Sequence, residues 1–410
     1  MIRYLLYFSV MFCLGACAVD VTPNDSKAYI KFLGSSRDEN IKSIQPTSDG
    51  GFILVGSTTS FRGKNQDLNF YVAKVDQNGD KQWQKNWGLE LDDEANAVME
   101  MPNGDFWILG YTTDTLETAN GRTDFAMLII GRDSVVKDYK RFVTPNINSK
   151  GKFITKISDS EFLLVGDVTQ PEQGNQQSTD MRAYRVNANR DSLASYSLGL
   201  LQTDDALVGM IKDSDNLLWI GDIKRRVTNN LPNRIRVAMS NLFGTVSDDY
   251  IFRENEAGQT NDEVGEAIYL DIPKTYVVVG TSSDGAGKDV CLLKFSIDGL
   301  FIDNSSIQFK RIDKDGNEEG KGIYATSDGG FIIVGKKIIK ENEDTDIYLL
   351  KVDAEGTEQW SKTFGGEGLD EGIAVRETPD GGFLVFANVW FKNNKVAGLY
   401  KTDKQGVIFK

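Results

Sequence analysis

The chain has 410 residues, with 60 acidic and 46 basic side chains, a formal net charge of -14 and no histidine. Without histidine, the chain cannot build a Ser-His-Asp or Cys-His catalytic arrangement or a histidine-ligated metal site. The negative charge argues against a nucleic-acid partner, because such partners bind basic surfaces.

The first residues have the pattern of a secretory signal. Arg3 precedes an apolar run at residues 4–14, which is too short to cross a bilayer as a helix. The run ends in Leu14-Gly15-Ala16-Cys17, which resembles the lipobox of bacterial lipoproteins. The alternative is an ordinary signal peptide with an incidental cysteine.

The lipobox resemblance implies that residues 1–16 are removed and that Cys17 is diacylated, for instance with palmitate. Residues 17–27 would then tether the body to a membrane, since two or three acyl chains make a stable anchor. Ala18 follows the cysteine in place of aspartate, which implies the outer membrane. The sequence does not say whether the body faces the periplasm or the outside of the cell.

From residue 28 onward one phrase recurs seven times, a short apolar strand that ends in glycine or alanine, as in Gly51-Phe52-Ile53-Leu54-Val55-Gly56. The spacing stays near 55 residues, and periods of this size indicate repeated supersecondary units. The anchoring residues are Phe52, Phe106, Phe162, Leu217, Tyr276, Phe331 and Phe383.

Each period holds four short strands, which we call a, b, c and d. The last copy predicts strand a at residues 372–377, strand b at 383–387 and strand c at 397–402, and the copy before it shows strand d at 359–364. Glycine-rich turns separate the strands, because tight hairpins often need positive φ. Four antiparallel strands repeated seven times predict an all-β, seven-bladed β-propeller over residues 28–410.

The two ends of the chain predict how the ring closes. Residues 28–34 match the strand d phrase at Trp360-Ser361-Lys362-Thr363-Phe364-Gly365, yet no strand a, b or c precedes them. The chain stops at Lys410, where the last strand d would begin. We therefore expect the N-terminal strand to complete the seventh blade.

The turns Asp49-Gly50-Gly51-Phe52 and Asp328-Gly329-Gly330-Phe331 resemble the DGGF-type propeller repeats of bacterial exported proteins. A fainter similarity to the tryptophan-docking repeats of quinoprotein propellers rests on a turn followed by Trp360, but that turn is one residue shorter, so we expect no quinone cofactor. Both resemblances imply a fold and leave the activity open.

Alternating strand direction gives the disc two different faces. The a–b and c–d turns define a turn face, and the b–c and d–a connections define a loop face. Long b–c loops are expected at residues 57–68, 111–123, 167–179 and 222–232. Loop-rich faces usually carry binding sites.

Acidic residues recur just before strand a in six repeats, whereas the third has Lys150 and Lys152. One hypothesis is a ring at the channel mouth that binds a cation such as calcium or a basic partner. The favoured alternative is that each carboxylate accepts backbone amides and ties neighbouring blades together, because buried polar groups need partners. The acidic residues are Asp38, Glu39, Asp93, Glu94, Asp204, Asp205, Asp262, Glu263, Glu318, Glu319, Asp370 and Glu371.

Most tryptophans fall inside predicted strands, where packing between blades explains them. Trp390 and Phe391 are the exception, since they begin the last b–c loop on the loop face and are candidate ligand contacts. Cys291 lies in an apolar run and is expected to be a small buried side chain.

Three functions remain. The leading prediction is a non-catalytic outer-membrane lipoprotein, a scaffold or accessory subunit of a membrane-associated assembly, secretion or uptake complex. The second is a glycan- or peptide-binding surface lipoprotein, favoured if the surroundings of Trp390 are exposed and concave. The third is a carboxylate-dependent propeller hydrolase or lyase, which needs two acidic groups with perturbed pKa in one pocket.

Overall fold

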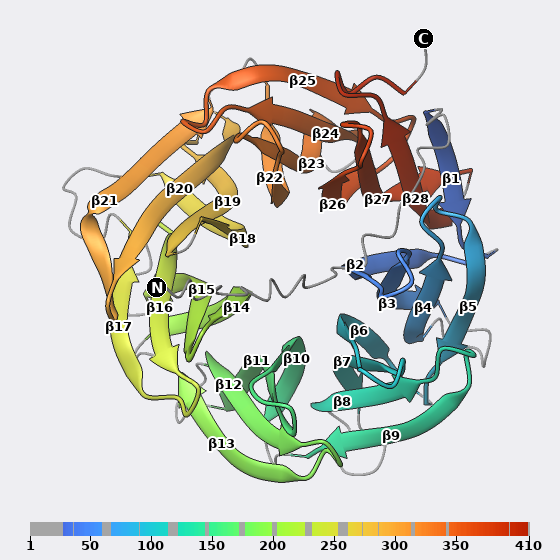
Figure 1. Ribbon diagram of the computed structural model, residues 1–410, viewed down its shortest axis with the longest axis vertical. Coiled ribbons are helices and arrows are strands. Elements are labelled where there is room, and N and C mark those ends of the chain that lie inside the picture. Colours follow the sequence, from blue (N-terminus) through green and yellow to red (C-terminus); the bar gives the residue numbers. More distant parts are fainter. Residues whose placement is uncertain are drawn as a thin grey trace, which may run out of the picture.

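The computed structural model describes residues 28–35, 37–59, 67–89, 91–113, 122–143, 147–171, 177–198, 203–225, 232–252, 261–272, 274–285, 287–312, 316–341, 344–392 and 394–408. Within them, seven four-stranded antiparallel sheets surround a central axis as the blades of a propeller (Figure 1). The predicted fold class is confirmed. The predicted signal, the lipid site at Cys17 and the tether lie outside the described residues.

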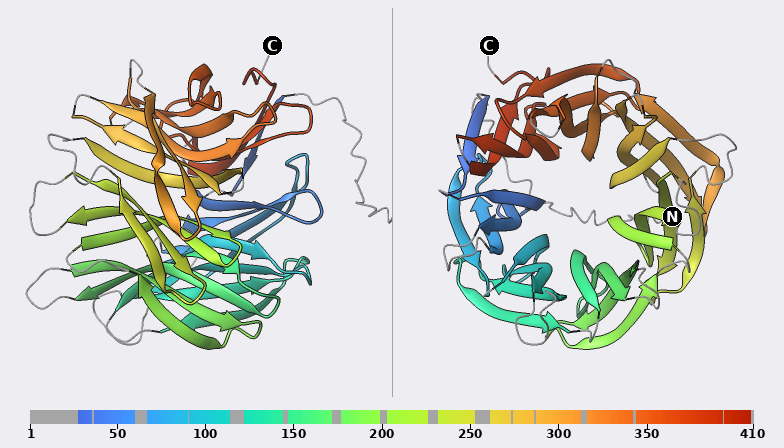
Figure 2. Two further views of the ribbon diagram at one scale, coloured as in Figure 1. Left: turned by 60° about the vertical axis from the view of Figure 1, so that its left-hand side comes forward. Right: turned by 180° about the vertical axis from the view of Figure 1, so that it is seen from behind.

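The strands follow the predicted order a, b, c, d in blades 1 to 6. Strand a of every blade lies nearest the axis and strand d lies at the rim (Figures 1 and 2). Blades 1 to 3 comprise β2 (Glu39–Pro46), β3 (Phe52–Thr59), β4 (Leu68–Val75), β5 (Lys81–Trp87), β6 (Asp93–Glu100), β7 (Phe106–Thr113), β8 (Thr123–Ile130), β9 (Val136–Phe142), β10 (Asn148–Lys156), β11 (Glu161–Pro171), β12 (Gln177–Asn187) and β13 (Ser192–Leu198).

Blades 4 to 7 repeat this arrangement. Their strands are β14 (Thr203–Asp213), β15 (Asn216–Arg225), β16 (Arg234–Asn241), β17 (Val246–Ile251), β18 (Asp262–Ile272), β19 (Thr275–Ser283), β20 (Lys288–Asp298), β21 (Phe301–Ile312), β22 (Glu318–Ala325), β23 (Phe331–Lys340), β24 (Asp344–Val352), β25 (Glu358–Phe364), β26 (Glu371–Glu377), β27 (Phe383–Phe391) and β28 (Asn394–Thr402).

The N-terminal strand completes blade 7. Strand β1 (Tyr29–Leu33) pairs antiparallel with β28, with Tyr29 opposite Lys401 and Leu33 opposite Ala397. The sheet order β1-β28-β27-β26 joins the two ends of the ring. The predicted closure is therefore confirmed.

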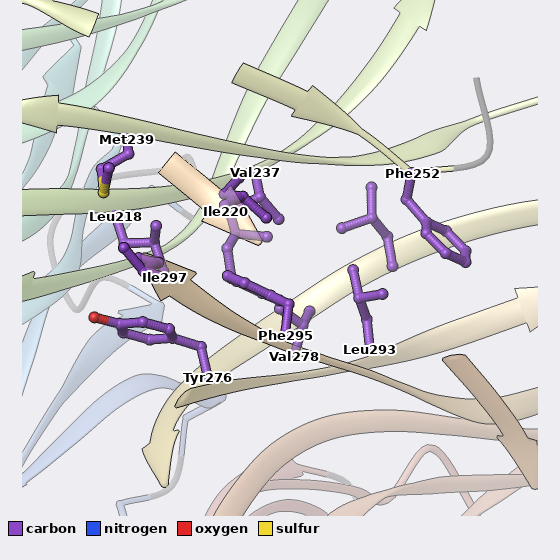
Figure 3. Close-up of a cluster of buried hydrophobic side chains, with 12 residues drawn as sticks. Leu218, Ile220, Val237, Met239, Phe252, Tyr276, Val278, Leu293, Phe295 and Ile297 are labelled. Carbon is purple, nitrogen blue, oxygen red and sulfur yellow. The ribbon is translucent and has the colours of Figure 1, made fainter. Parts of the chain in front are cut away.

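The hydrophobic core consists of clusters between neighbouring blades, because each blade buries both of its faces. Figure 3 shows the cluster between blades 4 and 5, where Leu218 and Val237 meet Tyr276 and Phe295. The closing strand contributes Leu33 to the cluster between blades 7 and 1. The ring is thus held together by side-chain packing as well as by the β1–β28 ladder.

The glycine that ends the repeated phrase has a steric reason. A Cβ on Gly56 would collide with the carbonyl oxygen of Asn40 in strand a, next to the register shift between Ile41 and Ser43. Gly335 meets the carbonyl of Glu319 in the same way. Glycine is needed there because two backbones approach closely at a bulge.

One predicted loop is shorter than expected. The sequence predicts a b–c loop at residues 167–179, but β11 and β12 continue their ladder outward to the pair Pro171 and Gln177. Backbone pairing therefore extends beyond the body of blade 3.

The central parts of the four predicted long loops lie outside the described residues. The described residues include no helix that is long and apolar enough to cross a membrane.

Candidate functional site

The DGGF turns are structural devices that hold a buried lysine. Asp49 Oδ1 accepts hydrogen bonds from Thr47 Oγ1 (2.6 Å), the amide of Gly51 (3.1 Å) and Lys74 Nζ (2.9 Å). Burial opposes ionisation of Asp49, but these bonds outweigh it and lower its pKa to about 2. The pairs Asp328 with Lys351 and Asp380 with Lys401 repeat the contact in blades 6 and 7.

The predicted acidic residues occupy three successive positions at the start of strand a. In the first, a side-chain oxygen accepts the amide that opens strand c of the preceding blade. Asp38 accepts from Lys395 (2.8 Å) and Asp262 from Asn233 (2.6 Å). Asp92, Asn148 and Asn317 fill the equivalent place in blades 2, 3 and 6 and accept from Leu68, Thr123 and Lys288.

The position of the bulge in strand a shows which acidic residues of blades 1 and 2 are equivalent, and the match differs by one residue from the one that the sequence suggests. Asp38 corresponds to Asp92, and Glu39 corresponds to Asp93, because Ile41 and Ala95 both precede the bulge. The acidic pairs matched by sequence alone therefore mix two structural positions.

The second position is buried. Asp93 Oδ2 accepts the amide of Leu89 (2.6 Å), and Asp370 Oδ2 accepts the amide of Gly366 (3.1 Å). Burial raises the pKa of Asp93 to about 6 and also raises the pKa of Asp370 and Glu39. Glu318 and Glu263 instead pair with Lys337 Nζ and Arg234 Nη1, both at 2.7 Å.

The third position carries Glu94, Glu319 and Glu371, which face basic side chains. Lys336 Nζ lies 3.1 Å from Glu319, and Lys42 Nζ lies 3.7 Å from Glu94. Lys321 lies 2.5 Å from Glu266 and 3.9 Å from Glu371, so it links blades 5, 6 and 7. The described residues contain no group of three or more acidic or cysteine side chains placed to hold a metal ion. Asp204 and Asp205 belong to β14, and their side chains lie outside the described part.

Two carboxyl groups near the axis have raised pKa values. Burial raises the pKa of Asp222 to about 7 with a further contribution from Glu266, whose own pKa is raised mainly by burial. Asp222 Oδ1 accepts the amide of Gly265 (2.9 Å), and Glu266 pairs with Lys321. These contacts tie blades 4, 5 and 6 together.

A groove of about 570 Å³ lies between blades 6 and 7 and includes Trp390 and Phe391. We call it the closure groove, because β1 forms one wall and the end of β25 forms the other. This volume is typical of ligand sites. Its lining comprises Ile30, Phe32, Lys362, Thr363, Phe364, Gly365, Gly366, Asp370, Val389, Trp390, Phe391, Tyr400, Gly406, Val407 and Ile408.

Aromatic rings dominate the closure groove. Phe32 stacks on Phe391 with ring centroids 4.7 Å apart, and Phe364 stacks on Tyr400 at 6.2 Å. Phe32, Trp390 and Phe391 remain 42–43% exposed. Exposed aromatic side chains gathered in a concave surface are typical of binding sites.

Asp370 fixes the rim of the closure groove. Its Oδ1 accepts the amide of Trp390 (2.6 Å), while its Oδ2 holds Gly366 of the opposite wall. A Cβ on Gly368 would collide with the Trp390 ring, so the indole lies directly against this glycine-rich segment. The position of Trp390 is therefore set before any ligand arrives.

Sequence reasoning identified Trp390 and Phe391 but missed Phe32, Phe364 and Tyr400. Phe32 belongs to the closing strand, and its place across from blade 6 follows from the β1–β28 register. The signal was available, because the predicted closure places residues 28–34 beside the last strand c.

No protein-family profile matches the chain, and no curated protein matches it. Among solved structures, a protein of unknown function from Dyadobacter fermentans is 12% identical, with a TM-score of 0.52 over 92% of this chain and 98% of that one. This likeness shows the fold alone.

Two further solved structures fall below a TM-score of 0.5. The β-propeller domain of the trilobed protease from Pyrococcus furiosus is 8% identical, with a TM-score of 0.48 over 90% of this chain and 95% of that one. A puromycin hydrolase is 12% identical, with a TM-score of 0.49 over 87% and 52%. At such identities a hydrolase neighbour assigns no activity to this chain.

Proposed function

We propose that this protein is a non-catalytic lipoprotein of the outer membrane that binds a protein partner through the closure groove. The observation that carries the proposal is the concave cluster of exposed aromatic side chains around Trp390. The lipobox at Cys17 supports an anchored location. Calcium plays no part in this proposal.

The chemistry of the groove favours an apolar peptide segment over a glycan. A glycan presents many hydroxyl groups, and each needs a polar partner when it leaves water. Among the charged and hydroxyl side chains of the lining, both oxygens of Asp370 already hold backbone amides. Lys362, Thr363 and the Tyr400 hydroxyl remain, which are few partners for a glycan, whereas aromatic-lined grooves suit extended peptides such as proline-rich segments.

The proposal combines the scaffold prediction with the peptide-binding alternative, which an exposed and concave surrounding of Trp390 was expected to favour. A partner that inserts one apolar segment between β1 and β25 would bind to a preformed groove, because Asp370 and the glycine-rich wall already hold Trp390 in place. Preformed sites lose little side-chain entropy on binding.

The test uses two matched variants of the full chain. Ile338 lies seven residues after Phe331, as Trp390 lies seven residues after Phe383. It therefore occupies the position in blade 6 that Trp390 occupies in blade 7, and Ile338→Ala is the control for Trp390→Ala. Envelope proteins that co-purify in mild detergent should be retained by Ile338→Ala and lost with Trp390→Ala. A central aromatic contact is worth about 2 kcal/mol, which is about a thirtyfold loss of affinity.

Two results would refute the proposal. One is the recovery of the lipoprotein alone under several detergents, which would show that it is not a subunit of a stable complex. The other is the displacement of the partner by soluble envelope glycans, which would make the groove a glycan site instead.

A further inference from the structure

A second exposed apolar surface lies on the turn face, away from the closure groove. It is formed by side chains in the turns of blades 4 and 5, and each of these side chains is 43–64% exposed. We call it the apolar turn patch. Its members are Phe243, Val246, Ile272, Leu300 and Phe301.

Hydrogen bonds join the segments of blades 4 and 5 that carry these side chains, while the ring centroid of Phe243 lies 4.8 Å from the guanidinium carbon of Arg185 in blade 3. The amide of Ile302 donates to Asp248 Oδ2 (2.7 Å), which brings the start of β21 against β17. The amide of Ile297 donates to the carbonyl of Lys274 (2.9 Å), which places the turn after Ile272 beside the next turn. Ile297 and Ile302 themselves are buried in the cluster shown in Figure 3, so the exposed side chains stand on a packed base.

The other blades show that such a turn does not require apolar residues. The residue equivalent to Phe243 is Asn78 in blade 1, Asn189 in blade 3, Glu355 in blade 6 and Gln405 in blade 7. The turn geometry therefore does not require an apolar side chain at the position of Phe243.

The start of β1 lies on the same face as the patch. Tyr29 pairs with Lys401, next to the last c–d turn, and Lys31 Nζ donates to the carbonyl of Asn78 (2.7 Å) in the first one. Residue 28, where the described chain begins, therefore lies on the turn face. In Figures 1 and 2, β1 and the pair β17 and β21 lie on opposite sides of the disc.

We propose that the apolar turn patch inserts into the lipid bilayer that carries the N-terminal tether. This inference rests on the proposed lipid anchor. Two attachments on opposite sides of the disc would lay the turn face on the membrane. Trp390 and Phe391, at the loop-face end of β27, would then lie away from it. Large exposed apolar patches mark membrane or protein contacts, and a second contact would fix the orientation of a body that its acyl chains already hold at the membrane.

The chemistry of the patch points to lipid tails and not to charged head groups. The body is acidic overall, with a net charge of -14 for the whole chain, so it gains nothing from anionic lipids. Insertion should therefore occur in zwitterionic vesicles and should persist at high salt, because apolar burial is not screened.

The test is photo-labelling of the mature lipoprotein in zwitterionic vesicles that contain a phospholipid with a photoactivatable acyl chain. Mass spectrometry should find at least fivefold more label in residues 241–246 and 298–302 than in the equivalent turns at residues 76–80 and 353–357. The variant Phe243→Asn, which copies the turn residue of blades 1 and 3, should lower the label at its turn at an unchanged melting temperature.

Equal labelling of all turns, or labelling confined to the loop face, would overturn the inference. Protection of the patch by an added envelope protein in place of lipid would overturn it as well. The lipid anchor itself is tested separately, by measuring the mass of the acyl group on Cys17. If that mass is absent, Cys17 is coupled to a maleimide lipid while Cys291 stays buried, so the labelling pattern still decides.

Discussion

At the scale of single residues, the surroundings divide the carboxyl groups into two classes. Those in the DGGF turns accept bonds from a lysine and from backbone amides, and their pKa falls. Those at the inner ends of the blades lose water without gaining an equal number of partners, and their pKa rises. The fold therefore favours the ionised form of an aspartate in a DGGF turn and the protonated form of an aspartate at the inner end of a blade.

Asp328→Asn should make the protein less stable at neutral pH by about 1 kcal/mol, because the half-exposed carboxylate no longer balances the buried Lys351. The pKa of Asp328 is lowered to about 2, so the wild-type contribution is present above pH about 4 and is lost as pH falls to about 2. Melting curves should show a weaker acid dependence in the variant. The exposed change Glu355→Gln is the control, and an equal acid dependence in wild type and Asp328→Asn would contradict the assignment.

Asp222→Asn should have the opposite effect on stability from Asp328→Asn and should stabilise the protein at high pH. The pKa of Asp222 is raised to about 7, so its contribution to stability is full below pH about 4 and is lost as pH rises to about 7. The amide can still accept the bond from Gly265 without a buried charge. Differential scanning calorimetry should show a melting temperature about 1 to 3 °C higher at pH 8 and little change at pH 4. A lower melting temperature at pH 8 would show that the ionised carboxylate is needed.

At the scale of elements, β1 is part of the core although it stands at the N-terminus of the described chain. Leu33 is 3% exposed and packs with Ile41 and Leu399. Leu33→Ala should therefore lower the free energy of unfolding by about 3 kcal/mol, as for a buried core leucine. Leu193, on strand d of blade 3, is 49% exposed, so Leu193→Ala should change stability by less than about 0.5 kcal/mol in urea unfolding. Similar effects of the two variants would mean that β1 does not close the ring in solution.

The d–a connections depend on glycine where a buried carboxylate sits beneath them. A Cβ on Gly88 would collide with the side chains of Asn69 and Asp93, whereas no atom lies within 4 Å of a Cβ on Gly366. Gly88→Ala should be destabilising by about 1 to 3 kcal/mol, and Gly366→Ala should be tolerated. Thermal melts of the two variants give the comparison, and an equal tolerance would show that Asn69 moves away at little cost.

At the scale of the whole molecule, the sequence predicted the fold because the repeat period, the turn glycines and the orphan strand at Tyr29 all depend on local pattern. The groove was predicted in part. The sequence predicts Trp390 at the start of a b–c loop, whereas it lies inside β27 opposite Lys395. Phe364 and Phe32 come from blades 6 and 7 and meet only when the ring has closed. A pattern within one repeat carries no information on that meeting.

The acidic positions show the same limit. In the sequence, Asp38-Glu39 and Asp93-Glu94 look like equivalent pairs, but the bulge follows Ile41 in one strand and Ala95 in the other, so Asp38 is equivalent to Asp92. Their hydrogen bonds support the interpretation as ties between blades for Asp38 and Asp262. Whether any of the remaining carboxylates bind a cation stays a prediction, and a rise in melting temperature with millimolar calcium would support it.

The most direct test of the central claim is photo-crosslinking in living cells from the rim of the closure groove. A photoreactive amino acid is placed at Phe391 or, as the matched position in blade 6, at Ile339. The account predicts one protein adduct from position 391 that is absent from position 339 and is lost when Trp390→Ala is added. Equal adducts from both positions, or no protein adduct from position 391, would contradict it.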